Sequence, residues 1–143
     1  MIPNVNRRIV LASRPHGMPG PANFRLEEVP CPQVAPADGL LLQVRWLSLD
    51  PYMSGRMSEG PSYAPPAEID GVMPGAAVCR VLASKSPDFA VGDTVLAFAG
   101  WQEVAALPVA GVVKLPADMA QPSWALGVLG MPGLTAYVGL LDI

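Results

Sequence analysis

The residue types best suited to chemistry gather in one stretch, Trp46–Met57, which reads W-L-S-L-D-P-Y-M-S-G-R-M. Tyr52 offers a flat ring and a hydroxyl, Met53 a polarisable thioether, and Arg56 a permanent positive charge. A turn with a purely structural role more often uses Asn, Asp, Ser and Gly. The stretch is therefore the best candidate for a ligand-facing surface. A second interpretation stays open, a buried turn with Tyr52 and Met53 packed in the core.

Nucleophilic and metal chemistry find little support elsewhere in the chain. There is one histidine, His16, and it lies in a loop rich in Pro and Gly, which argues against a Ser-His-Asp triad. The two cysteines, Cys31 and Cys79, are too few for a disulfide framework or, with a single histidine, for a structural zinc site. A reducing compartment is the simpler expectation.

Composition bounds the class of protein. The chain has 143 residues with a formal net charge of −3, 51% hydrophobic and 15% charged residues, and its mean hydropathy is +0.35. The length predicts one domain with a substantial core. Basic residues are scattered singly, so no nucleic-acid partner is expected. No run reaches the roughly 20 apolar residues of a membrane span, and no secretory segment follows the N-terminus. A cytoplasmic protein is expected.

The elements that would position the central stretch are short strands. Leu40–Leu47 is the clearest of them, and Pro51 prevents its ladder from continuing. Phe24–Val29 alternates at period two and predicts an edge strand with Leu26 towards the core. The other predicted strands are Arg7–Ala12, Thr94–Ala99, Gln102–Leu107 and Gly111–Leu115, and Val72–Leu82 is expected to be a strand pair or one bent strand with a kink or bulge at Pro74-Gly75. Gly and Pro punctuate the series every 8–12 residues or so, which is typical of a mainly β barrel or sandwich.

The pattern changes after Pro116. Residues 117–143 are rich in Ala, Leu and Met, and they predict a first helix over Trp124–Leu129 and a second from Leu134 to Ile143. Gly130-Met131-Pro132-Gly133 is expected to separate the two helices. The second helix has no stop signal, so we expect residues 1–116 to form a barrel domain and 117–143 to lead into a further domain. The apolar excess here indicates a face that meets another domain or subunit.

Three motifs now combine. S-L-D-P-Y-M-S-G-R-M, the F-x-x-G-D-x-V run over Phe89–Val95 with Trp101-Gln102-Glu103 beyond it, and G-M-P-G-L-T-A-Y-V-G-L-L from Gly130 occur in this order. Together they resemble the zinc-independent medium-chain dehydrogenase/reductases, within the NADPH-dependent 2-alkenal, prostaglandin and curcumin reductase group. The resemblance implies the N-terminal domain of such an enzyme, a partly open GroES-like β-barrel with helices leading towards an absent Rossmann domain.

The resemblance also implies an activity. NADPH would transfer a hydride to the β-carbon of an α,β-unsaturated aldehyde or ketone, in a full-length homodimer. The stretches corresponding to the zinc ligands of related enzymes read Leu49-Asp50-Pro51 and Val72-Met73-Pro74, with neither His nor Cys. No G-x-G-x-x-G phosphate loop follows a strand here. We therefore expect NADP to be bound mainly by the absent domain, and this chain alone to be inactive.

On the substrate side, the resemblance makes Tyr52 the best catalytic candidate, as a wall of the pocket or a hydrogen-bond donor to the carbonyl. A buried Tyr bonded to the backbone is the alternative. Tyr63 would line the entrance or merely cover the barrel mouth. For Arg56 we expect an ion pair with Asp50 or Glu59, rather than contact with a cofactor phosphate.

On the cofactor side, Pro51 and Met53 would shape the nicotinamide end of the pocket, although Met53 as a core filler is an equal alternative. Met131 and Thr135 lie where the chain would cross towards the nucleotide-binding domain. Thr135 resembles the residue whose hydroxyl faces the nicotinamide ring; alternatively its hydroxyl bonds the carbonyl one turn back.

Two other functions stay open. A quinone reductase of the same superfamily would share the architecture and differ in substrate. A non-enzymatic β-barrel module for ligand binding or interaction would explain the missing nucleotide-binding fold, but not the apolar C-terminal segment.

Overall fold

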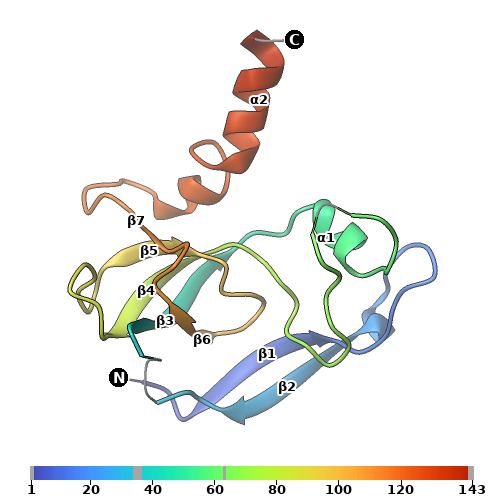
Figure 1. Ribbon diagram of the computed structural model, residues 1–143, viewed down its shortest axis with the longest axis horizontal. Helices are drawn as coiled ribbons and strands as arrows, with labels where there is room; N and C mark the ends of the chain where they lie inside the picture. Colours follow the sequence, from blue (N-terminus) through green and yellow to red (C-terminus); the bar gives the residue numbers. More distant parts are fainter. Residues whose placement is uncertain (1, 34–36, 63, 142–143) are drawn as a thin grey trace.

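The computed structural model describes residues 2–33, 37–62 and 64–141, and these form two antiparallel sheets with a helical C-terminal segment (Figure 1). β1 (Val5–Leu11) and β2 (Phe24–Pro30) make the smaller sheet. The larger sheet has the order β6-β3-β4-β5-β7, with β3 (Gly39–Leu47), β4 (Ala77–Ser84), β5 (Thr94–Ala97), β6 (Val104–Pro108) and β7 (Val113–Lys114). The helical elements are η1 (Pro21–Asn23), α1 (Tyr52–Arg56), η2 (Pro122–Leu126) and α2 (Met131–Leu141).

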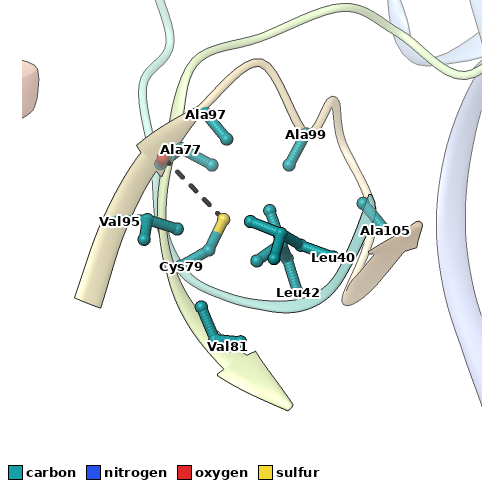
Figure 2. Packing of buried hydrophobic residues seen from close by; sticks show 9 residues of the cluster. All are labelled: Leu40, Leu42, Ala77, Cys79, Val81, Val95, Ala97, Ala99 and Ala105. Atoms are coloured by element: carbon teal, nitrogen blue, oxygen red, sulfur yellow. Dashed lines mark hydrogen bonds between the residues drawn. The ribbon is translucent and has the colours of Figure 1, made fainter. Parts of the chain in front are cut away.

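The core lies against β3 and β4, as the run of leucines in β3 predicts. Leu40 and Leu42 point into a cluster of small residues, and Leu41 points to the opposite face, where it meets Cys31 and Val104. We call the first group the inner cluster; its members are Leu40, Leu42, Ala77, Cys79, Val81, Val95, Ala97, Ala99 and Ala105 (Figure 2). Both faces of β3 are buried over residues 39–42, and this part of the strand is apolar throughout.

Several strands differ from their predicted bounds. The expected strand over Val72–Leu82 joins the large sheet only at Ala77. Before that, Val72 forms a single bridge to Val10, and Pro74 has no N–H to offer a ladder. A Cβ on Gly75 would lie 3.1 Å from the ring of Trp101, so this segment runs against a side chain rather than a strand. β5, β6 and β7 are likewise shifted or shorter at their ends than the sequence predicts.

The edge strand is confirmed, but its inward face is not the predicted one. β2 pairs with β1 alone within the described sheets, and Leu26 is 64% exposed. Glu27, expected on the outside, is half-buried and accepts a hydrogen bond from Arg8 at 2.9 Å. Since ion pairs can satisfy a partly covered strand face, alternation alone did not determine which side of β2 faces the protein.

The C-terminal segment also departs from prediction. The expected first helix is a short 3-10 helix, η2, and α2 begins at Met131 rather than Leu134. Pro132 does not separate helices, because the first turn of a helix tolerates a residue without an N–H. η2 is anchored by Ala125, which packs with Val78 and Leu115. α2 projects away from the sheets (Figure 1), and all its described residues except Gly133 are exposed. In the described part of the chain, no helix is long and apolar enough to cross a membrane.

Candidate functional site

The predicted turn after β3 contains a short helix, α1. Pro51 already has helical torsions, with φ −56° and ψ −32°, and the N–H of Met53 donates to the carbonyl of Asp50 at 3.1 Å. Pro51 lies four residues after the end of β3 and starts the helix, because the first helical turn does not require the N–H that proline lacks. The interpretation of this stretch as a turn was wrong. The helix matters because it gives Tyr52 and Arg56 positions one turn apart.

Tyr52 contributes to a pocket at the junction between the large sheet and the C-terminal segment. Its volume is about 160 Å³. We call it the junction pocket; its lining is Ser48, Asp50, Tyr52, Ala76, Leu96, Ala97, Phe98, Gly111, Ala125, Leu126, Met131 and Pro132. The hydroxyl oxygen of Tyr52 is buried. The pocket is therefore mainly apolar and contains few polar side chains, the usual composition of a site for a small organic molecule.

The structure brings Tyr52 and Met131 together, although 79 positions separate them in the chain. Pro51 and Met53 lie elsewhere, along a neighbouring groove with Phe24 and Trp101. Successive residues of a helix are about 100° apart, so Met53 turns away from Tyr52 into the core. It is 3% exposed and packs in a cluster with Leu11, Met57, Ala67 and Met73. Tyr63 lies outside the described residues.

Thr135 is exposed on α2, and its hydroxyl donates to the carbonyl of Met131 at 2.9 Å. This is the local bond that the sequence offered as the alternative to a role at the nicotinamide ring. Thr135 does not line the junction pocket, whereas Met131, one turn earlier on the same helix, does. For the Thr135 hydroxyl to act at the nicotinamide ring, it would first have to break its hydrogen bond to the carbonyl of Met131.

The expected ion pair of Arg56 is not formed. Glu59 instead accepts from Arg14, with 3.0 Å between Nε of the arginine and Oε1 of the glutamate. In residues 2–33, 37–62 and 64–141, no carboxylate lies within ion-pair distance of Arg56. Glu59 pairs with Arg14 rather than Arg56 because Arg14 also donates to the carbonyls of Met57 and Ala67, each at 3.1 Å. These two hydrogen bonds fix the Arg14 side chain beside Glu59.

Phe98 and Leu126 belong to the junction pocket and were missed by the sequence analysis. Phe98 follows β5 and is 66% exposed. The sequence did contain a signal for Phe98. Period-two alternation places it on the face opposite the inward-pointing Val95 and Ala97, and a large aromatic ring on an exposed face indicates a binding surface. Leu126 had no such signal, because its place depends on how η2 packs.

The described part of the chain contains no group of side chains suited to metal binding and no activated thiol. No three His, Cys, Asp or Glu side chains lie close enough there to hold a metal ion. Cys79 is fully buried in the inner cluster, and burial raises the pKa of its thiol to about 12. Such a thiol is almost entirely protonated at neutral pH and is a poor nucleophile.

The comparisons with known proteins agree with this geometry. Residues 7–115 match the family described as the N-terminal domain of oxidoreductase. The chain belongs to this family. It is 57% identical to the NADPH-dependent curcumin reductase of Escherichia coli (strain K12) over 139 residues, covering 96% of this chain and 40% of that protein. It is 40% identical to prostaglandin reductase 1 of Rattus norvegicus over 133 residues, covering 89% and 37%.

Solved structures give the same result. CurA from Vibrio vulnificus superposes with a TM-score of 0.88 at 53% identity, and its complex with NADPH with 0.83 at 48%. Both comparisons cover 96% of this chain and 40% of the other. The chain thus spans about 40% of the length of these relatives, and it corresponds to the N-terminal domain of reductases of the alkenal, curcumin and prostaglandin group.

The described residues fit only one end of a dinucleotide. The mainly apolar lining of the junction pocket suits an aromatic ring. The start of α2 does not suit a pyrophosphate, because Pro132 has no N–H and the N–H groups of Gly133 and Leu134 already donate to Gly127 and Gly130, each at 3.0 Å.

Proposed function

We propose that this chain is the substrate-side domain of an NADPH-dependent oxidoreductase that reduces the C=C bond of α,β-unsaturated aldehydes or ketones without zinc. In this proposal residues 1–116 are a GroES-like barrel and 117–143 lead into the nucleotide-binding domain of a cytoplasmic homodimer. The observation that carries the proposal is the junction pocket, in which Tyr52 from the first family motif meets Met131 from the last. The relatives named above support the choice of cofactor and reaction.

The chain's own residues would perform three tasks. The apolar walls formed by Leu96, Phe98 and Leu126 exclude water and hold a conjugated substrate flat. The hydroxyl of Tyr52 donates a hydrogen bond to the substrate carbonyl, whose oxygen gains negative charge as the β-carbon is reduced. Met131 and Pro132 support the ring of the cofactor, and bound NADPH supplies the hydride. The proton that completes the product at the α-carbon is not assigned to a residue.

The test uses the full-length protein that contains this chain. NADPH oxidation and loss of the conjugated enone absorbance are followed together for a 2-alkenal, for an enone and for a quinone. Tyr52→Phe removes only the hydroxyl and should lower kcat/KM by about tenfold to a hundredfold, since the donor acts on developing charge. Tyr137→Phe, an equally conservative change on exposed α2, should leave kcat/KM unchanged.

The result also separates the alternatives. Thr135→Ala tests whether its hydroxyl leaves the Met131 carbonyl to serve the reaction. If neither Tyr52→Phe nor Thr135→Ala changes kcat/KM by more than about threefold, roughly 0.7 kcal/mol, both residue assignments fail. Faster turnover of quinones than of enones would replace the proposal with a quinone reductase. Absence of any NADPH-dependent reduction would favour a binding module.

A further inference from the structure

One residue with a polar side chain is buried in the described part of the chain, Asn6 of β1, which is 3% exposed. Nδ2 of Asn6 donates to the carbonyl of Val104 at 2.9 Å and to Oε1 of Gln102 at 3.2 Å, and Oδ1 accepts from the N–H of Val104 at 2.9 Å. The bonds to Val104 link β1 to β6 and so join the two sheets. The bond to Gln102 leads instead to the connection between β5 and β6, and it needs an explanation of its own.

Gln102 passes this contact on to the backbone of the same connection. Because its amide oxygen faces Asn6, its amide nitrogen points the other way and donates to the carbonyl of Ala99 at 2.7 Å. The N–H of the same peptide unit, from Gly100, donates to the carbonyl of Gly75 at 3.0 Å. The peptide between Ala99 and Gly100 is therefore held on both sides. Gly100 has a φ of +73°, and a Cβ there would lie 2.9 Å from a backbone carbonyl oxygen, so the chain turns here without room to adjust.

Phe98 lies directly before this peptide, between it and the end of β5. At that end Ala97 pairs with Ala77 of β4. Phe98 itself is 66% exposed, so packing in the core does not hold it. Its place in the junction pocket therefore depends on the backbone on both sides of it. The strand ladder fixes one side, and the hydrogen bond from Gln102 to the carbonyl of Ala99 fixes the other.

A second cavity lies beyond Phe98. It has a volume of about 390 Å³, whereas the junction pocket has about 160 Å³. Val72, Leu107, Gln102 and Arg56 are among its walls, and Nε of Arg56 is buried there without a hydrogen-bond partner in the described part of the chain. Among the described residues, Phe98 is the only one that lines both spaces. It marks the boundary between them, and its displacement would enlarge the junction pocket towards the second cavity.

We propose that Gln102 is a positioning residue: supported by Asn6, it holds Phe98 as a wall of the junction pocket and so limits the size of the aromatic or conjugated ketone that the pocket accepts. The limit on substrates rests on the proposed function; the limit on ligands does not. A site is precise when the residues that line it are held by hydrogen bonds from behind, and Gln102 supplies such a bond next to the most exposed wall. A purely structural role for Gln102 would affect stability without changing which ligand is preferred.

The experiment uses this chain and two matched probes, acetophenone and 2-acetonaphthone, which share the acetyl group and differ by one ring. Chemical shifts of the backbone amides are followed during titration with each, and the ratio of the two affinities is the readout. Gln102→Glu keeps the oxygen that accepts from Asn6 and places a second oxygen against the carbonyl of Ala99, which repels it. The ratio should move about fivefold towards the larger ketone. Phe98→Ala removes the wall itself and should move the ratio at least as far.

The matched control is Gln33→Glu. The amide nitrogen of Gln33 also donates to a backbone carbonyl, that of Cys31 at 2.9 Å, but Gln33 lines neither cavity. This change should alter the affinity ratio by less than about twofold. If Gln102→Glu does not fold, Gln102→Met has a similar length, loses both hydrogen bonds and should move the ratio in the same direction. In Phe98→Ala, adding Gln102→Glu should change the ratio by less than about twofold, because the residue through which Gln102 acts is already gone.

The full-length protein gives a second readout, with benzylideneacetone and its naphthyl analogue as substrates. Gln102→Glu should lower the KM of the naphthyl compound relative to the phenyl compound by about fivefold and leave kcat for benzylideneacetone within about twofold. A fall in kcat for both substrates with an unchanged ratio of KM values would mean that Gln102 acts on the reaction in general and not on the wall of the pocket.

Three results overturn the proposal: no binding of either ketone to the native chain, an affinity ratio that Gln102→Glu leaves unchanged, or a shift that is as large in Gln33→Glu or persists in Phe98→Ala. The two proposals also fail separately. If the ratio shifts as expected and the full-length protein reduces no enone, the proposed function is wrong and the role of Gln102 stands. If enones are reduced with the same preference for size in Gln102→Glu, the role of Gln102 is wrong and the reaction stands.

Discussion

The inner cluster and α2 both consist mainly of apolar residues, but these residues are buried in the inner cluster and exposed on α2. In the inner cluster Leu40, Leu42 and Cys79 have no exposed surface, and the surrounding residues are mostly alanine and valine (Figure 2). On α2 the side chains of Leu134, Leu140 and others remain exposed, at 64% and 82% for these two. The same kinds of residue are covered in one place and uncovered in the other.

This difference teaches what each region depends on. The residues of the inner cluster come from β3, β4, β5, β6 and the segment after β5, and they bury one another within the described part of the chain. α2 has 11 residues, a length at which a helix without packing is marginal in water. Its stability and its apolar surface both call for a partner that the described residues do not supply. Mutations should therefore have different consequences in the two regions.

The largest expected effect compares two leucines. Leu42→Ala in the inner cluster should lower the free energy of unfolding by about 2–5 kcal/mol, because it removes buried methyl groups and leaves a cavity. Leu140→Ala, at an exposed position, should change it by less than about 0.5 kcal/mol. Urea unfolding followed by tryptophan fluorescence measures both. Equal losses would mean that α2 is buried in solution and would remove the contrast.

A smaller effect compares two glycines of α2. A Cβ on Gly133 would lie 1.8 Å from the carbonyl oxygen of Val128, whereas a Cβ on Gly139 meets nothing within 4 Å. Gly139→Ala should stabilise the helix by about 1 kcal/mol, the ordinary gain of alanine over glycine. Gly133→Ala should reverse the sign, because the chain before α2 must move. Hydrogen exchange of the α2 amides measures both; faster exchange in Gly139→Ala than in Gly133→Ala would contradict the prediction.

The contrast also shows which parts of the structure could be predicted. β3 was identifiable because its first residues, buried on both faces, form a continuous apolar run, and β4 and β5 because their apolar runs lie between Gly and Pro turn signals. α1 was not, because a proline that follows a strand is compatible with a turn as well as with the first turn of a helix. The start of α2 was misplaced for the same reason, at Pro132.

The sequence predicted some residues of the junction pocket, but not how they are arranged in space. The family motifs led to Tyr52 and Met131, and the structure places both in the junction pocket. Whether Met53 joined them depended on the helical rotation of about 100° between neighbours, which requires knowing that a helix is present. The unpaired Nε of Arg56 depended on Arg14, a residue 42 positions earlier, taking Glu59. Competition between distant side chains has no local signature.

The smallest expected effect on stability concerns the charged surface of the β1–β2 sheet. Its side chains are partly exposed, unlike the buried inner cluster and the exposed α2. Glu27 accepts hydrogen bonds from Arg25 and Arg8, and Arg25 also donates to Asp70 at 2.8 Å. Hydrogen bonds from Arg25 and then from Arg8 lower the pKa of Glu27 below its ordinary value. A hydrogen bond from Arg7 lowers the pKa of Glu103 in the same direction.

The sign follows from linkage. A carboxylate whose pKa is lower in the folded than in the unfolded state contributes stability above its ordinary pKa and loses it as the pH falls through the lowered value. The thermal midpoint should therefore fall from about pH 4.5 downwards. Glu27→Gln should be slightly less stable at pH 6 and should lose less on acidification, whereas Glu28→Gln, beside it but outside these ion pairs, should follow the native curve. Parallel curves for all three proteins would show that solvent screens the Glu27 ion pairs completely, so that backbone hydrogen bonds and packing hold the β1–β2 sheet in place without them.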